Sequence, residues 1–279
     1  MRHISKEDVS VAIKNTLIKI NHTLPNPVTQ ALKQARDEED KELPKSILND
    51  IVENQEIAGK GVFPLCQDTG MVVVFAEIGR HAQMNFNLEE TVNEAVREAY
   101  EEGYLRKSIV GHPLERKNTN TNTPAIIHQR LTEGDTLRLK VAAKGGGSEN
   151  MSSVSMLKPT DGEKGIKSHV IKTIKEAGGK PCPPIIVGIG LGGNLEKSAL
   201  MAKEAVMREL DDESDDDAIK ALEHELLDAI NDTDVGPMGV GGKTTCLAVK
   251  INTHPTHIAS LPVAVNIQCH AARHEVIEL

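Results

Sequence analysis

The chain contains no tryptophan, two tyrosines and three phenylalanines among its 279 residues. Proteins that bind single-stranded nucleic acid without sequence preference stack the bases on aromatic side chains, and this chain has few of them. The formal net charge of -9 also opposes contact with a phosphate backbone. These two features argue against nucleic acid as a partner.

The sequence also lacks a long apolar segment. No stretch approaches the ~20 apolar residues that a membrane-spanning helix requires. The N-terminus carries charges at Arg2, Lys6 and Glu7, where a secretory signal needs an apolar block. We therefore expect a cytoplasmic protein that does not associate with membranes.

Cysteine is scarce as well, with four residues at long and irregular intervals. A disulfide-stabilised protein would carry its cysteines in a shorter chain, so this spacing favours metal-binding or catalytic thiols. The apolar content of 39% is sufficient for a large core. We expect a compact globular protein.

The spacing of apolar residues predicts mixed α and β structure. Near the N-terminus, Ser5 and Asp8 resemble a capping box, and Pro27 and Pro44 can each open a further helix. Helical spacing recurs at 88–99, 166–174, 195–206 and 219–230, and strand-like runs occupy 71–78, 137–141, 185–189, 244–251 and 261–267. No internal repeat or linker is evident. We therefore predict one α+β domain over 1–279, with a mixed sheet and with residues 1–60 as its helical N-terminal part.

Three of the four cysteines lie in distinctive surroundings. Cys66 and Cys182 are in loops bounded by proline, and Cys269 ends a predicted strand. Cys246 lies inside an apolar strand, and we assign it to packing. Three thiolates from distant segments suit an iron-sulfur cluster, and a cubane held by only three leaves one iron free to act as a Lewis acid. Each cysteine taken alone is also compatible with a small buried apolar residue.

Polar groups follow Cys66 directly. Gln67 and Asp68 place an amide and a carboxylate beside any metal that this thiolate holds, and the carboxylate could move a proton at a substrate carbon. Asp68 could equally cap the turn at Thr69 and Gly70. The glycines at 145–147 form a flexible loop whose N–H groups could approach a carboxylate, although such a run is equally common in a plain turn.

Other motifs allow more than one interpretation. The run Gly-Ile-Gly-Leu-Gly-Gly at 188–193 superficially resembles a dinucleotide fingerprint, but its glycine spacing differs. A helix N-terminus near a small anion or the cluster explains it better. His254 and His257 could bind a metal or orient a substrate. Arg106 could bind a carboxylate or lie exposed at a helix end.

Four separated segments occur in an order that is typical of one family. They are 62–70 (Val-Phe-Pro-Leu-Cys-Gln-Asp-Thr-Gly), 144–150 (Lys-Gly-Gly-Gly-Ser-Glu-Asn), Cys182 before Val-Gly-Ile-Gly, and 257–269, which starts His-Ile-Ala-Ser-Leu-Pro-Val. Over essentially its whole length the chain resembles the α subunit, or N-terminal half, of class I fumarate hydratases and L-tartrate dehydratases, which are iron-sulfur hydro-lyases.

The resemblance implies a 4Fe-4S cluster held by Cys66, Cys182 and Cys269. It also implies a proton-transfer group, Asp68, and four groups near a bound dicarboxylate: Gln67, Arg106, Gly147 and His257. The implied reaction is the reversible hydration of fumarate to malate, a step of the tricarboxylic acid cycle. One iron would polarise the substrate while a protein acid delivers the proton.

Single-chain members of the family carry a further C-terminal domain, whereas this chain ends ten residues after Cys269. The resemblance therefore implies a separate β subunit that completes the site, in an α2β2 assembly. L-tartrate dehydration is the nearest alternative, because one extra substrate hydroxyl could be recognised by the β subunit. A non-catalytic iron-sulfur or metal-binding protein with Cys246 as a fourth ligand, and a nucleotide-dependent enzyme built on 188–193, are more remote alternatives.

Overall fold

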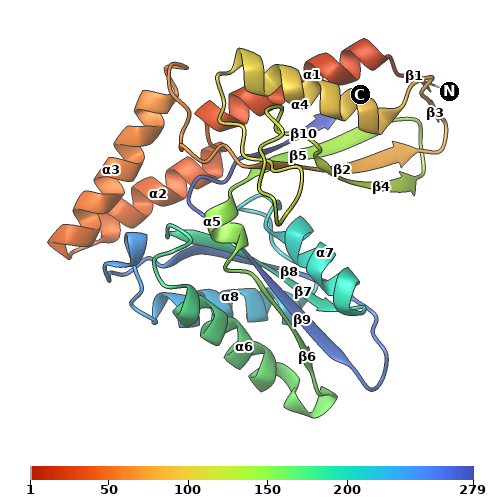
Figure 1. Ribbon diagram of the computed structural model, residues 1–279. Helices are drawn as coiled ribbons and strands as arrows, with labels where there is room; N and C mark the ends of the chain where they lie inside the picture. The colour runs from red at the N-terminus through yellow and green to blue at the C-terminus, as the bar shows by residue number, and fades with distance from the viewer. Residues whose placement is uncertain (1) are drawn as a thin grey trace. The chain divides into compact units, whose positions relative to one another are not determined.

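The computed structural model describes residues 2–279, and the chain divides into two compact units (Figure 1). Unit 1 comprises the chain up to residue 25 together with 55–146 and 273–279, and unit 2 comprises 26–54 and 147–272. Each unit combines helices with a sheet that has both parallel and antiparallel pairs, which confirms the predicted α+β fold. The single domain predicted over 1–279 stays a prediction.

Unit 1 is built on a four-stranded sheet with the order β10-β5-β2-β4. Its elements are β1 (Arg2–His3), α1 (Lys6–His22), β2 (Met71–Gly79), β3 (Ala82–Gln83), α4 (Leu88–Glu102), β4 (Ile126–Thr132), β5 (Leu137–Lys144) and β10 (His274–Glu278). The central strand β2 pairs parallel with β4 and antiparallel with β5. Helices α1 and α4 lie side by side over one face of this sheet, where their apolar residues form one core with those of β2 and β5 (Figure 1).

Helix α1 forms as its sequence predicts. The Ser5 side chain accepts a hydrogen bond from the Asp8 N–H at 3.0 Å, which satisfies a donor that the first helical turn leaves unpaired. Val9, Ile13 and Leu17 recur every four residues and are fully buried against the sheet. The cap therefore stabilises the N-terminal end of this helix, and burial of one apolar face packs it against the sheet.

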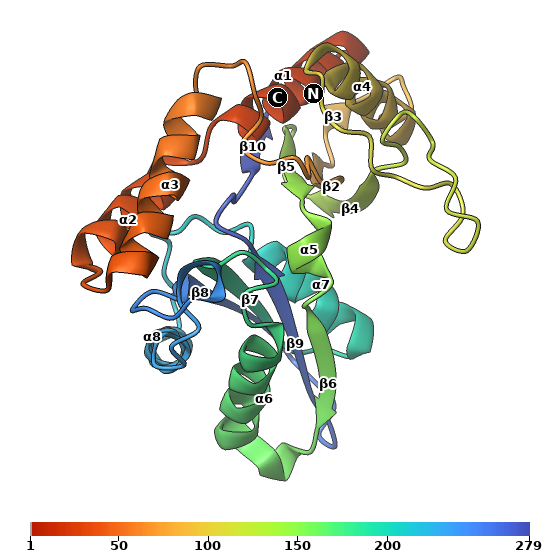
Figure 2. The same cartoon turned by 60° about the vertical axis from the view of Figure 1, so that its left-hand side comes forward.

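Unit 2 is built on a second four-stranded sheet, with the order β6-β9-β7-β8. Its elements are α2 (Asn26–Glu38), most of α3 (Glu42–Ala58) and of the short α5 (Gly146–Glu149), β6 (Ser153–Leu157), α6 (Gly162–Ala177), β7 (Ile185–Gly192), α7 (Leu195–Ala205), α8 (Asp217–Asn231), β8 (Cys246–His254) and β9 (Leu261–Gln268). Helices α6 and α8 cover one face, and α7 covers the other (Figure 2). Alternate residues of β7 therefore face different helices.

Strand β7 continues to Gly192, beyond the end predicted at Ile189. Its glycines approach α7 closely: a Cβ atom at Gly188 would lie 2.4 Å from the Ala202 carbonyl oxygen. A Cβ atom at Gly190 would lie 2.0 Å from the Ser198 carbonyl oxygen. The glycines that resemble a nucleotide fingerprint therefore allow a helix to pack directly on a strand.

Among residues 2–279, five strands escape the sequence prediction: the short β1 and β3, which pair with each other, and β4, β6 and β10, which lie at the edges of the four-stranded sheets. The glycine run at 145–147, which is expected to be a flexible loop, instead leads into the helical turn α5. Among the helices of residues 2–279, none is long and apolar enough to cross a membrane.

We predict that Gly190→Ala destabilises unit 2, because the added methyl group collides with the α7 backbone. We expect the free energy of unfolding, measured by urea denaturation, to fall by more than about 3 kcal/mol. Gly111→Ala is the matched control, because the nearest atoms to its added Cβ, apart from the adjacent residues, would lie 3.9 Å away. Equal stability of the two variants would show that α7 can move away from β7 without cost.

Candidate functional site

The segment 66–70 precedes β2 in unit 1, and its backbone is held at both ends. At its start, the Leu65 N–H donates to the Asn21 carbonyl at 2.7 Å. At its end, Gly70 has a φ of +81°, and a Cβ atom there would lie 2.7 Å from the Ala143 main chain of β5. Only glycine suits this combination of left-handed backbone and close approach.

Buried side chains of unit 1 bind the carbonyl groups of this segment. The Tyr100 hydroxyl donates to the Thr69 carbonyl at 2.6 Å and to the Gly70 carbonyl at 3.1 Å. The Asn122 amide also donates to the Gly70 carbonyl, at 3.1 Å. Burial raises the pKa of Tyr100 above its usual value, so the hydroxyl stays protonated and acts as a donor. These bonds fix the backbone that carries Cys66, Gln67 and Asp68.

Asp68 is half-buried, and both of its carboxylate oxygens accept backbone hydrogen bonds. Oδ1 accepts from the Gly70 N–H at 3.0 Å, and Oδ2 accepts from the Gly146 N–H at 2.8 Å. The first bond is the turn cap that the sequence offers as an alternative role. The second bond joins the 66–70 segment to the start of the glycine run, so the carboxylate is held between two loops of unit 1.

Arg106 lies beside the same segment. The Thr69 hydroxyl donates to the Arg106 carbonyl at 2.8 Å, while the Arg106 side chain is exposed. Gln67 is exposed as well, and its Oε1 accepts from the Cys66 thiol at 3.5 Å. Unit 1 thus brings together Cys66, Gln67, Asp68 and Arg106, four of the residues that the sequence singles out.

In unit 2, the loops that carry Cys182 and Cys269 meet at His270. The His270 N–H donates to the Cys182 carbonyl at 3.4 Å, and His270 Nδ1 lies 2.9 Å from the same oxygen. Because a carbonyl only accepts, Nδ1 carries the proton. Gly147 lies beside this region: a Cβ atom there would be 3.7 Å from the Lys180 carbonyl.

A polar cluster fixes α5 within unit 2. Lys203 of α7 pairs with the Glu149 carboxylate of α5, and the Asn266 amide of β9 donates to the same oxygen at 3.1 Å. Burial lowers the pKa of Lys203, and the Glu149 charge opposes this shift. The cluster ties the turn that contains Gly147 to the strand that ends just before Cys269.

His257 occupies a different part of unit 2. It is exposed in the connection between β8 and β9, where its Nδ1 accepts from the Ala259 N–H at 3.1 Å. Cys269 follows the opposite end of β9. At about 3.3 Å per residue, the length of this strand separates the two side chains by more than 20 Å. Unit 2 therefore does not bring His257 to Cys269.

The four cysteines differ in their exposure, which bears on the cluster that the resemblance implies. Cys66, Cys182 and Cys269 are partly exposed, whereas Cys246 is buried and its thiol donates to the Ala248 carbonyl at 3.1 Å. Burial raises the pKa of Cys246 to about 12, so this thiol is protonated and is a poor ligand. Within the part of the chain that the structure describes, no group of three or more His, Cys, Asp or Glu side chains is arranged to hold a metal ion.

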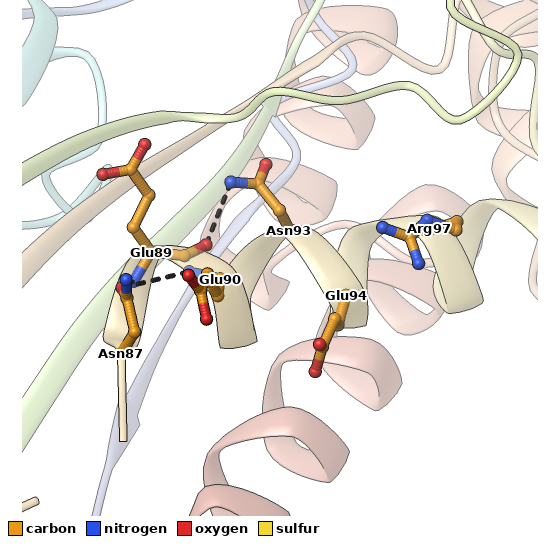
Figure 3. Close-up of a pocket in the computed structure, with 6 residues that line it drawn as sticks. All are labelled: Asn87, Glu89, Glu90, Asn93, Glu94 and Arg97. Carbon is orange, nitrogen blue, oxygen red and sulfur yellow. Dashed lines mark hydrogen bonds between the residues drawn. The ribbon is translucent and has the colours of Figure 1, made fainter. Parts of the chain in front are cut away.

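A separate surface pocket of about 440 Å³ lies on α4 (Figure 3). It is lined by Asn87, Glu89, Glu90, Asn93, Glu94 and Arg97. Three carboxylates against one guanidinium repel an anionic ligand. None of the residues predicted for the site takes part in this pocket.

Four residues that support the candidate sites were not predicted from the sequence: Tyr100, Asn122, His270 and Arg273, whose Nη1 donates to the Asp68 carbonyl. Tyr100 is one of only two tyrosines in the chain, and its helical position gave no further signal. His270 and Arg273 follow Cys269 closely in the sequence Cys-His-Ala-Ala-Arg. That proximity to a predicted ligand is the one signal that could have revealed them.

Comparison with known proteins relates the whole chain to one group. The model of the fumarate hydratase (Fumerase) family matches residues 10–278. A Methanocaldococcus jannaschii protein, which is named provisionally as an L(+)-tartrate dehydratase subunit alpha, is 44% identical over 260 residues, or 91% of each chain. The L(+)-tartrate dehydratase subunit alpha of Escherichia coli strain K12 is 27% identical over 264 residues, which are 94% of this chain and 87% of that protein.

We predict that the four thiols differ in reactivity in the cluster-free full-length chain. Iodoacetamide should modify the partly exposed Cys66, Cys182 and Cys269, while Cys246 stays unmodified until denaturant is added. At about pH 8 we expect Cys246 to react at least ~10²-fold more slowly, because little thiolate is present. Mass spectrometry of the cysteine peptides measures each rate. Modification of Cys246 as fast as the others would contradict its assignment to packing.

Proposed function

The chain belongs to the fumarate hydratase (Fumerase) family, and we propose that it is the α subunit of a hydro-lyase that adds water to fumarate to form malate. The observation that carries this proposal is the family match over residues 10–278, which includes every residue that the sequence assigns to the site. The reaction breaks the π bond of the substrate double bond and one O–H bond of water, and it forms one C–O bond and one C–H bond.

We expect Cys66, Cys182 and Cys269 to hold a 4Fe-4S cluster. Their partial exposure supports this assignment, as does the buried and protonated state of Cys246. When bound, such a cluster supplies Lewis-acid chemistry through an iron that has no protein ligand. The hydrogen bond between His270 Nδ1 and the Cys182 carbonyl holds the loops of Cys182 and Cys269 together.

Asp68 is the proposed proton-transfer group. In the direction of hydration, a proton must reach the carbon next to the one that receives the hydroxyl group, and the reverse reaction removes it. A carboxylate serves this purpose when its position is fixed relative to the substrate. The backbone N–H groups of Gly70 and Gly146 fix the Asp68 carboxylate in this way.

The substrate is a dianion, and the proposed contacts supply donors for it. The exposed Arg106 guanidinium can bind one carboxylate through two parallel hydrogen bonds. The Gln67 amide and the N–H of the exposed Gly147 add neutral donors. His257 is also proposed to lie near the substrate, but its place at the opposite end of β9 from Cys269 weighs against that role.

We propose that a β subunit completes the site, in an α2β2 assembly. The relatives from M. jannaschii and E. coli are named as alpha subunits, which supports a partner chain. Their names also favour a second candidate substrate, L(+)-tartrate. Dehydration of tartrate uses the same acid-base groups, and the extra hydroxyl requires only one further polar contact.

The test is an anaerobic assay of the chain copurified with its β subunit, with fumarate, L-malate and L(+)-tartrate offered separately. We expect turnover of fumarate and L-malate to exceed that of L(+)-tartrate, and the isolated chain to show little turnover. Activity on L(+)-tartrate alone would replace the first candidate by the second. Activity on none of the three by the cluster-loaded complex would overturn the proposed function.

Asp68→Asn tests the proton-transfer role within this complex. We expect kcat to fall by about 10²- to 10⁴-fold at unchanged iron and sulfide content, because the amide cannot carry the proton. Asp50→Asn, at an exposed position of α3, is the matched control and should retain kcat. An Asp68→Asn complex with normal kcat would assign the proton transfer to another residue.

A further inference from the structure

Arg273 has an unusual environment for an arginine. It is 2% exposed and is among the largest buried side chains of the protein. Its Nε has no hydrogen-bond partner among the residues that the structure describes. Burying a cation costs free energy unless it is well paired, so fold stability alone gives no reason for an arginine at this position.

The contacts of Arg273 point to the 66–70 segment. Its Nη1 donates to the Asp68 carbonyl at 2.6 Å and to the Asn21 side-chain oxygen at 3.2 Å. Both acceptors are neutral, and the shorter bond goes to the main chain of the proposed catalytic residue. A hydrogen bond from a cation is stronger than one between neutral groups, particularly when it is buried.

The guanidinium also lies close to the carboxylate of Asp68. A Cβ atom at Gly145 would meet both groups, at 3.3 Å from Asp68 Oδ2 and 3.4 Å from Arg273 Nη2. Because Gly145 has no side chain, the Arg273 guanidinium and the Asp68 carboxylate can both lie close to the Gly145 backbone. Asp68 is held at two points: its carbonyl accepts from Arg273, and its carboxylate accepts from the Gly146 N–H.

We propose that Arg273 is a positioning residue that sets the place of Asp68 through the Asp68 main-chain carbonyl. The inference rests on the proposed function, because Asp68 needs a fixed place only if it transfers a proton. Asn21 in turn fixes Arg273, and its own amide donates to the Leu17 carbonyl of α1 at 2.9 Å. Hydrogen bonds thus connect helix α1 in the core of unit 1, through Asn21 and Arg273, to the loop that contains Asp68.

Arg273→Met tests this proposal, because methionine fills much of the space but cannot bind the Asp68 carbonyl. Hydrogen exchange of the full chain is measured on peptides that cover 66–70 and, for reference, 88–96 in α4. We expect exchange to accelerate in 66–70 and to remain unchanged in 88–96. In the complex with the β subunit, kcat should fall by about 10²-fold while KM stays within roughly twofold, as expected for a misplaced catalytic group.

Arg80→Met is the matched control in the same unit, because Arg80 is exposed and pairs with Glu133 on the surface. It should change neither exchange nor kcat. Should Arg273→Met fail to fold, Arg273→Gln replaces it, since glutamine keeps a polar end but is too short to reach the Asp68 carbonyl. The same local pattern in Arg273→Gln supports the proposal.

Three results would overturn either the positioning role of Arg273 or the proposed function. Normal exchange in 66–70 together with normal kcat would overturn the positioning role. Faster exchange throughout unit 1 with kcat per active site unchanged would also overturn it, because that pattern marks a purely structural residue. A wild-type complex without hydro-lyase activity, combined with the local exchange change in Arg273→Met, would overturn the proposed function while the control of the loop by Arg273 stands.

Discussion

The candidate site of unit 1 depends on hydrogen bonds that side chains donate to the backbone carbonyl groups of the segment 66–70. The carbonyls of residues 68, 69 and 70 accept hydrogen bonds from three side chains of unit 1: Arg273, Tyr100 and Asn122. A carbonyl shielded from water needs a hydrogen-bond partner, so these three donors stabilise the backbone conformation of the loop. These side chains of unit 1 thereby fix the positions of Cys66, Gln67 and Asp68.

In unit 2, polar contacts likewise hold the candidate site segments in place. His270 joins the cysteine loops through the Cys182 carbonyl, and the Glu149 carboxylate joins α5 to α7 and β9. In both units, most candidate site residues lie on loops, and the groups that hold them come from helices, strands and neighbouring loop residues such as Asn122 and His270. This arrangement gives precise placement without requiring that the loops themselves form a core.

The sequence predicted the elements whose pattern is local and missed those that depend on neighbours. Helix α1 was predictable because Ser5 and its apolar spacing act within the helix itself. Strands β4, β6 and β10 lie at sheet edges, where one missing neighbour leaves no clear alternation to read. The packing role of Gly190 and the burial of Arg273 depend on segments far away in the sequence. The three candidate cysteines were singled out by their local surroundings, but their long and irregular spacing defines no metal motif, and the 4Fe-4S cluster on all three was implied by the family resemblance.

The central proposal is that Cys66, Cys182 and Cys269 hold a cluster with one iron that the protein does not ligate. The most direct measurement is an electron paramagnetic resonance spectrum of the anaerobically reconstituted chain after mild oxidation, together with its iron and sulfide content. The account predicts a 3Fe-4S signal that disappears when ferrous iron is added back, since only the unligated iron is lost. The absence of a cluster, or zinc in its place, would contradict it.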